Sequence, residues 1–200
     1  KQCAANFAPL NYQIPFKIMT NPSHQVLTVV LPAYNERENV DVLVAALHQA
    51  DIHGQIKRII YVDDDSPDLT SEHIKSSHYP IDVLCIHRIG RQGLSSAVVE
   101  GILLADTKYV AVMDADGQHT PRDLMEMLQV AIAKGDQLVI GSRFKNQATV
   151  ETHVGLRSLL SKVGNRLANH VLRRQLSDPL TGFFLMERSL FTEVLRYWLM

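Results

Sequence analysis

Two aspartates separated by one residue, Asp114 and Asp116, are the strongest candidates for chemistry in this sequence. Alternate side chains of an extended segment point to the same side, so both carboxylates can face one ion. Hard oxygen ligands, with the amide of Gln118 close by, suit Mg²⁺ or Mn²⁺ and leave positions open for phosphate oxygens. We therefore expect a metal site at Asp114, Asp116 and Gln118. The structural alternative is an acidic loop that caps the helix predicted after Thr120.

Two further polar stretches follow apolar runs earlier in the chain. Residues 32–36 read Pro-Ala-Tyr-Asn-Glu, and residues 63–68 read Asp-Asp-Asp-Ser-Pro-Asp. Each stretch alone is explained by capping of a helix N-terminus, where acidic side chains suit the helix dipole. Three consecutive aspartates are a poor cap, however, because like charges repel unless a cation or a donor ligand shares the site. We interpret these aspartates as part of a binding site.

Other candidate residues are fewer and less specific. A later apolar run ends in Gly141-Ser142-Arg143, where the guanidinium can reach phosphate oxygens in the same crevice, although a solvated surface arginine is the alternative. The turn Gly90-x-x-Gly93 matches neither the dinucleotide fingerprint nor the P-loop, so we expect its glycines to allow close backbone packing. The nine histidines and two cysteines show no zinc-like spacing, and the separated cysteines indicate a reducing compartment.

The elements that must position these residues alternate between strand and helix. Helical spacing of apolar residues predicts several helices, one with Thr120 as N-cap and Pro121 at the first helical position. Continuous apolar runs predict strands that are buried on both faces, as in a parallel sheet covered by helices. The fold class is therefore α/β, with the binding crevice outside the carboxyl ends of the strands. The predicted strands are Leu27–Leu31, Ile59–Val62, Val83–Ile86, Tyr109–Met113 and Gln137–Ile140, and a short apolar run follows at Phe183–Met186.

Length and composition indicate a folded domain. The 200 residues are 46% hydrophobic and 20% charged, which excludes disordered, collagen-like and disulfide-scaffold classes. No apolar run approaches the roughly 18 to 20 residues that span a bilayer. We expect residues 1–24 to form an N-terminal arm or tail, and residues 25–200 to form one catalytic domain that is cut short at its C-terminus.

Charge is distributed unevenly along the chain. Residues 1–140 hold 11 Lys and Arg against 17 Asp and Glu, whereas residues 141–200 hold 9 against 4. The longest helical pattern, residues 156–173, lies in this basic part and carries Arg157 and Ser161 on its polar face. A solvated helix face is the plain interpretation, and an anion site is the functional one.

Five ordered motifs resemble those of the family 2 inverting glycosyltransferases, and most closely the polyprenyl (dolichyl) phosphate mannosyltransferase branch. The motifs are residues 31–36, 62–68, 113–119, 141–143 and 177–183. The resemblance implies a GT-A, Rossmann-like nucleotide-sugar-binding fold and a hexosyltransferase that uses Mg²⁺ or Mn²⁺. Its donor would be a GDP- or UDP-sugar, with mannose favoured over glucose, and transfer would invert the anomeric centre. The acceptor would be a polyprenyl phosphate at the cytoplasmic, inner face of a membrane, with no nucleic-acid partner.

The resemblance also implies roles for individual residues. Residues holding the nucleotide-sugar would be Pro32, Tyr34, Glu36, Val62, Asp63, Asp64, Ala115, Asp116 and Arg143. The metal would lie at Asp114, Asp116 and Gln118, and the acceptor phosphate at Arg157 and Ser161. The catalytic residues would be Asp116, Arg143 and Arg157. Asp65 departs from the family pattern, which usually has glycine after the two aspartates, and a left-handed turn there is harder for aspartate.

Two other functions compete with this one. The segment Asp114-Ala-Asp-Gly also resembles the nucleophile loop of haloacid-dehalogenase-like phosphatases. That loop normally follows the first strand and has Thr or Val at the position of Gln118, whereas here it follows the fourth predicted strand. The second alternative is a nucleotide-sugar-binding module without turnover, which the short C-terminus favours. Donor hydrolysis or transfer to a lipid phosphate would separate this module from an enzyme.

Overall fold

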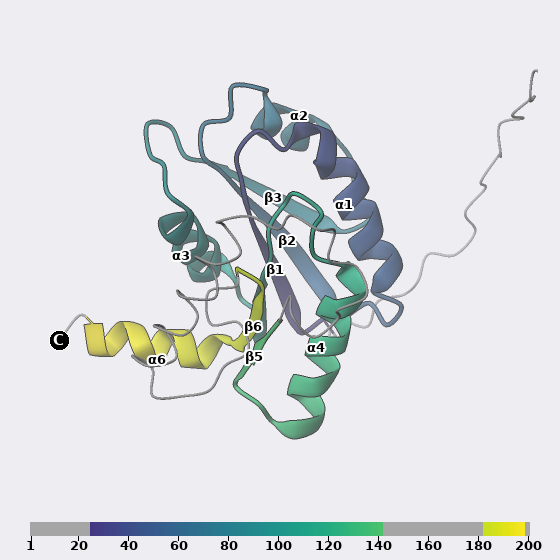
Figure 1. The fold of residues 1–200 in the computed structure, drawn as a ribbon, viewed down its shortest axis with the longest axis vertical. Coiled ribbons are helices and arrows are strands. Elements are labelled where there is room, and N and C mark those ends of the chain that lie inside the picture. The colour runs from purple at the N-terminus through teal and green to yellow at the C-terminus, as the bar shows by residue number, and fades with distance from the viewer. Residues whose placement is uncertain (1–24, 142–181, 199–200) are drawn as a thin grey trace, which may run out of the picture.

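The computed structural model describes residues 25–141 and 182–198, which form a six-stranded sheet with helices on both faces (Figure 1). The strand order is β3-β2-β1-β4-β6-β5. Strands β1 to β4 are parallel, while β6 is antiparallel to both β4 and β5. The predicted α/β class with a mostly parallel sheet is confirmed. The strands are β1 Leu27–Ala33, β2 Ile56–Asp63, β3 Asp82–His87, β4 Tyr109–Val112, β5 Leu138–Ile140 and β6 Phe184–Glu187.

Two cores hold the helices to the sheet. One core joins α1, α2 and α4 to the sheet face that carries Val29 and Leu31, and the other joins α3 and α6 to the face that carries Val30. Successive residues of β1 therefore enter opposite cores, as the two-residue period of a strand requires. The helices are α1 Arg37–Ala50, α2 Thr70–Ser76, α3 Leu94–Leu104, α4 Pro121–Lys134 and α6 Arg188–Trp198.

Burial differs between the central and the outer strands. Every residue of β4 is buried, whereas Leu84 in β3 is 37% exposed and Leu138 in β5 is 47% exposed. The prediction of strands buried on both faces is therefore right for the central strands and wrong for β3 and β5. Those two strands are the edges of the sheet, where one side has no neighbouring strand. The short helix α2 follows the second acidic stretch, where the start of a helix was the alternative interpretation.

The parallel strands bring their carboxyl ends to one edge of the sheet. Ala33 pairs with Asp63 at the ends of β1 and β2, and Val30 pairs with Val112 at the end of β4. The chain leaves each of these strands into a loop and then a helix. The predicted start of α4 is confirmed, since Thr120 Oγ1 accepts the N–H of Asp123 at 3.1 Å. The loops that carry the predicted chemistry therefore meet in space.

Candidate functional site

A cavity of about 280 Å³ opens at the carboxyl ends of β1, β2 and β4. Glu36, Asp64, Asp114 and Asp116 all contribute carboxylates to its wall, and no described lysine or arginine lines it. Such a wall suits a ligand that brings a cation or N–H donors. The described lining residues are Pro32, Ala33, Tyr34, Glu36, Asp64, Leu94, Asp114, Ala115 and Asp116.

Backbone hydrogen bonds tie the loop after β1 to the loop after β2. The N–H of Asn35 donates to Ser66 Oγ at 2.9 Å, and the N–H of Glu36 donates to Thr70 Oγ1 at 3.1 Å. Asn35 has a φ of 61°, a left-handed conformation that asparagine adopts more readily than most residues. These contacts turn the chain sharply after β1, and the turn places Tyr34 and Glu36 on the cavity wall.

Asp68 connects the starts of α1 and α2 beside this turn. Its carboxylate accepts the N–H of Arg37 at 3.1 Å and the N–H of Thr70 at 3.0 Å. Burial raises the pKa of the Asp68 carboxyl, but the hydrogen bonds from Thr70 and Arg37 outweigh burial, so this pKa lies below its ordinary value of 3.8. An ionised Asp68 therefore holds the two helix starts together.

The aspartates on either side of Asp64 have partners within the protein. Asp63 is fully buried, and its carboxylate accepts hydrogen bonds from the hydroxyl and the N–H of Ser66. Asp65 has a left-handed φ of 59°, and its Oδ1 lies 2.9 Å from Nε2 of His87. The expectation that a cation or ligand must offset their repulsion is therefore wrong for these two residues. Ser66 in the same loop is the partner of Asp63, and His87 at the end of β3 is the partner of Asp65.

Asp64 is held by Arg88, a buried arginine that was not among the predicted site residues. Oδ1 of Asp64 lies 2.7 Å from Arg88 Nε, and Oδ2 accepts the N–H of Gly93 at 2.8 Å. Arg88 also donates to the Ser96 hydroxyl at 2.8 Å and to the Gly93 carbonyl at 3.0 Å. A fully buried guanidinium needs such partners, because an unpaired buried charge is strongly unfavourable. The sequence feature that could have identified Arg88 is its position directly after the third predicted strand.

The carboxylates after β4 are more exposed. The Asp114 side chain is 41% exposed, and Asp116 accepts the N–H of Gln118 at 3.0 Å within its own turn. Gly117, the residue after Asp116, has a φ of 75°, which allows the turn that brings Asp116 onto the cavity wall. This pair therefore lies on a more solvent-accessible part of the wall than Asp64 does.

The donor set fits a magnesium or manganese ion that is shared with a ligand. Such ions are commonly held by one or two carboxylates together with waters and substrate phosphates, and not by a cage of protein side chains. Asp114 and Asp116 supply two carboxylates on one wall. In the part of the chain that the structure describes, no three His, Cys, Asp or Glu side chains are grouped to hold a metal. An ion here would need oxygen ligands from outside this part of the protein.

The structure brings most of the predicted site residues together. Those that line the cavity are Pro32, Tyr34, Glu36, Asp64, Asp114, Ala115 and Asp116. Val62 and Asp63 are fully buried and do not line it, and Gln118 is exposed outside its lining. Arg143, Arg157 and Ser161 lie outside the described residues, as do the predicted arm 1–24 and the helical pattern 156–173.

The glycines before α3 serve the conformation of the backbone. Gly90 has a φ of 67° and Gly93 a φ of 134°, and a Cβ at Gly90 would meet nothing within 4 Å. The prediction that these glycines allow close packing is therefore wrong, because what they allow is a positive φ. The turn sets Leu94, the first residue of α3, on the cavity wall. Leu94 was not among the predicted site residues, although it follows the glycine turn directly.

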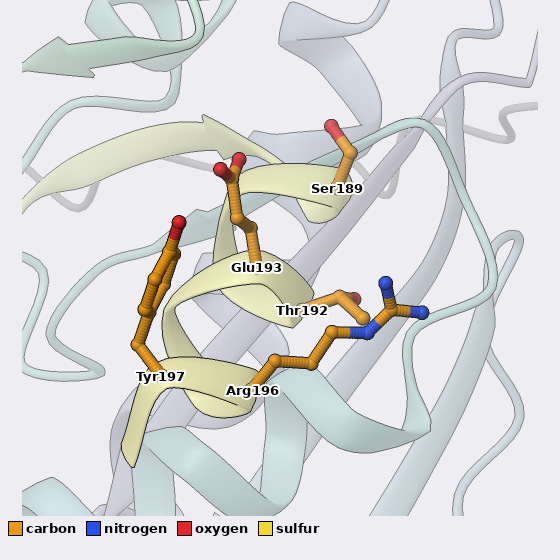
Figure 2. Close-up of a pocket in the computed structure, with 5 residues that line it drawn as sticks. All are labelled: Ser189, Thr192, Glu193, Arg196 and Tyr197. Atoms are coloured by element: carbon orange, nitrogen blue, oxygen red, sulfur yellow. The ribbon is translucent and has the colours of Figure 1, made fainter. Parts of the chain in front are cut away.

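A larger cavity of about 640 Å³ runs along α6 (Figure 2). Its described lining comes from that helix alone: Ser189, Thr192, Glu193, Arg196 and Tyr197. Figure 2 shows Ser189 and Glu193 pointing to one side and Arg196 to another. None of the residues predicted for chemistry is among them, so the smaller cavity at the strand ends is the candidate site.

Comparison with known proteins identifies relatives of this chain. Residues 28–195 match glycosyl transferase family 2. A dolichol-phosphate mannosyltransferase of Pyrococcus furiosus is 38% identical over 167 residues, covering 82% of this chain and 46% of that protein. A polyprenol monophosphomannose synthase of Mycolicibacterium smegmatis is 32% identical over 181 residues, covering 86% of this chain and 65% of that protein. The chain thus spans between about half and two thirds of these relatives.

Solved structures share the fold. A mannosyl-3-phosphoglycerate synthase from Rubrobacter xylanophilus has a TM-score of 0.64 at 20% identity, covering 84% of this chain and 54% of that one. A glucosyl-3-phosphoglycerate synthase from Mycobacterium tuberculosis, in complex with Mn²⁺, UDP and phosphoglyceric acid, has a TM-score of 0.62 at 17% identity, covering 84% and 57%. The expected GT-A fold is confirmed.

The family match decides between the glycosyltransferase and the phosphatase interpretations of the Asp-x-Asp segment. The match covers most of the chain, and two curated relatives exceed 30% identity. The resemblance to polyprenyl phosphate mannosyltransferases is confirmed, and the phosphatase alternative is not supported. The chain belongs to glycosyl transferase family 2.

Proposed function

We propose that the protein is a hexosyltransferase that moves mannose from a nucleotide-sugar to a polyprenyl phosphate. The observation that carries this proposal is the cavity where Asp114 and Asp116 meet the loops after β1 and β2. The names of the curated relatives support mannose and a polyprenol-type acceptor. The Mn²⁺ and UDP bound to a structural neighbour support a metal-assisted nucleotide-sugar site.

The nucleoside of the donor would lie against the β1 and β2 loops. Tyr34 is 51% exposed on the cavity wall and offers a flat surface for a base. Asp64 is an acceptor-only carboxylate fixed by Arg88, so it favours a base edge that presents N–H donors. Glu36 on the same wall offers a second acceptor. We assign nucleoside recognition to Tyr34, Glu36 and Asp64.

The diphosphate of the donor would lie towards the loop after β4. Asp114 and Asp116 would hold a divalent cation there, with Gln118 as a further oxygen donor. When bound, the cation supplies positive charge that stabilises the leaving diphosphate. Without it, the four carboxylates of the wall repel a diphosphate. Donor binding and metal binding are therefore coupled through Asp114 and Asp116.

The acceptor phosphate needs no general base from the protein. A phosphate monoester has a second pKa of about 6, so near neutral pH it is already a nucleophilic oxyanion. Its attack on the anomeric carbon forms the new C–O bond as the bond to the diphosphate breaks, which inverts the anomeric centre. The protein then positions the reactants and stabilises charge. We assign Arg143 to the donor phosphates and Arg157 with Ser161 to the acceptor phosphate.

A lipid acceptor requires access to a membrane surface, and we propose the cytoplasmic face. Among the helices of the described residues, none has the length and apolar character needed to span a bilayer. Basic residues close in sequence to Arg157 and Ser161, such as Lys162 and Arg166, would each contribute about 1 kcal/mol of attraction to an anionic leaflet if they lie near its surface.

The test combines ligand protection and transfer. Thermal unfolding is measured with GDP-mannose, UDP-glucose, GDP and UDP, each with and without Mn²⁺. We expect a rise in Tm that needs Mn²⁺ for the diphosphates, since a ligand at 100 times its Kd adds about 2.7 kcal/mol. Radiolabelled donor and polyprenyl phosphate then report transfer. No protection by any ligand contradicts the proposal, and protection without transfer or donor hydrolysis favours the binding module.

A further inference from the structure

An aromatic stack holds His119 against the first carboxylate of the Asp-x-Asp pair. The rings of His119 and Phe183 have centroids 4.5 Å apart and planes inclined by 24°. Nε2 of His119 lies 3.5 Å from Oδ2 of Asp114. The His119 side chain is 11% exposed and Phe183 is 4% exposed, so the stacked rings are largely shielded from water, while the Asp114 side chain is 41% exposed.

Two glycines make room for this arrangement. A Cβ at Gly141 would lie 2.2 Å from Phe183 Cδ1, so the phenyl ring occupies the space where another residue would have its side chain. A Cβ at Gly182 would lie 3.1 Å from Oδ1 of Asp114, which is tighter than ordinary contact. Gly141 also donates its N–H to the Phe183 carbonyl at 2.9 Å. Gly182 and Phe183, directly before β6, therefore lie against Asp114 and His119, and Gly141, directly after β5, lies against Phe183.

The backbone of His119 is fixed from its other side by α4. The next residue, Thr120, caps this helix by accepting the N–H of Asp123 at 3.1 Å. Asp116, in contrast, is exposed and precedes the positive-φ residue Gly117. The two carboxylates of the pair are therefore held in different ways, Asp114 beside the stacked His119 ring and Asp116 by the N–H of Gln118 within its own turn.

We propose that His119 is a positioning residue for the divalent cation. Clamped on Phe183, its ring orients the Asp114 carboxylate as one ligand of the ion. This inference rests on the proposed metal role of the pair. Residues that orient a ligating carboxylate from outside the coordination sphere matter, since their loss costs about 10- to 100-fold in metal affinity. A side chain held in one rotamer also loses less entropy when the ion binds.

The experiment separates positioning from space-filling. His119→Phe keeps an aromatic ring to stack on Phe183 and removes the ring nitrogens. We expect the Kd for Mn²⁺, from electron paramagnetic resonance titration of the free ion, to rise at least about tenfold. The Tm without metal should stay close to that of the wild type. His119→Gln restores an N–H donor and should recover part of the affinity.

A matched control and a second variant complete the test. His53→Phe makes the same change in the connection between α1 and β2, at the opposite end of the strands, and should leave Mn²⁺ affinity unchanged. Phe183→Leu loosens the stack and should weaken Mn²⁺ binding even if His119→Phe does not fold.

Three outcomes bear on different parts of the proposal. Equal Mn²⁺ affinity in His119→Phe and the wild type overturns the role of His119 and leaves the proposed transfer reaction standing. Failure of the wild type to bind Mn²⁺ overturns the metal site and this inference together. Weakened Mn²⁺ binding in a protein that transfers no sugar supports the role of His119 and overturns the proposed function alone.

Discussion

The two acidic strand ends that line the cavity balance their charge in different ways. After β2, the partners of Asp63, Asp64 and Asp65 are a serine, a buried arginine with a backbone N–H, and a histidine. After β4, Asp114 faces His119 and Asp116 accepts a backbone N–H of its own turn. The protein itself supplies these partners of the first end, whereas we propose that a cation balances the charge of the second.

Burial explains the difference. Asp63 is fully buried, and a buried carboxylate without partners costs several kcal/mol. The Asp114 side chain is 41% exposed, so water also stabilises its charge. The same residue type at the same sheet edge can therefore build a fixed wall in one place and a cation site in another.

The largest expected effect is on the loop after β2. Arg88→Met removes the guanidinium from the buried pair with Asp64 and should lower the free energy of unfolding by about 3 kcal/mol. Arg91→Met is the matched control, because Arg88 and Arg91 both pair with Glu100 and the Arg91 side chain is 61% exposed. Its loss should cost less than about 1 kcal/mol. Urea denaturation measures both. Equal losses for the two variants would show that burial does not set the strength of this network.

Metal binding should depend on the loop after β4. Asp116→Asn should change the free energy of unfolding by no more than about 0.5 kcal/mol in metal-free buffer. It should lose most of the stabilisation that Mn²⁺ with GDP or UDP provides, about 2.7 kcal/mol at 100 times the Kd. Asp65→Asn, at the other strand end, should keep that stabilisation. Thermal unfolding with and without Mn²⁺ checks both, and an intact metal effect in Asp116→Asn contradicts the site.

Asp63 tests whether an acidic residue outside the cavity is structural. Asp63→Ala leaves the buried hydroxyl and N–H of Ser66 without their acceptor, which should cost about 1 to 3 kcal/mol. Affinity for GMP or UMP in the folded variant, measured by calorimetry, should stay near that of the wild type. A stable variant with lost nucleotide affinity would instead place Asp63 in the nucleoside site, as the resemblance implied.

The smallest expected effect is a pH dependence at Asp68. Hydrogen bonds from Thr70 and Arg37 hold the pKa of this carboxyl below 3.8, so the ionised form stabilises the folded state. A depressed pKa contributes stability that is complete above the unfolded-state pKa and lost as pH falls through the folded-state pKa. Asp68→Asn should therefore weaken the fall in stability below about pH 4. An unchanged acid limb in urea denaturation would contradict this.

The sequence was informative where the pattern is local. Apolar runs predicted β1 to β5, and Thr120 with Pro121 predicted the start of α4, because strand burial and helix capping depend on residues close in the chain. The run that forms β6 was noted as apolar but was not predicted as a strand. The position of the acidic stretches after the apolar runs also predicted the cavity. Parallel strands must bring those stretches to one edge, and Tyr34, Asp64 and Asp114 do lie on one wall.

Only the tertiary structure decided which aspartate does what. Asp63, Asp64 and Asp65 are adjacent letters, yet one is buried against its own loop, one is held by Arg88 from the end of β3, and one lies beside His87. Arg88 and His87 are 24 and 22 residues away from Asp64 and Asp65 in the chain, so no local pattern pairs them with these aspartates. The sequence determined which carboxylates gather at the sheet edge. Long-range packing determined which of them have partners from distant elements, because burial and partner distance set the cost of a charge.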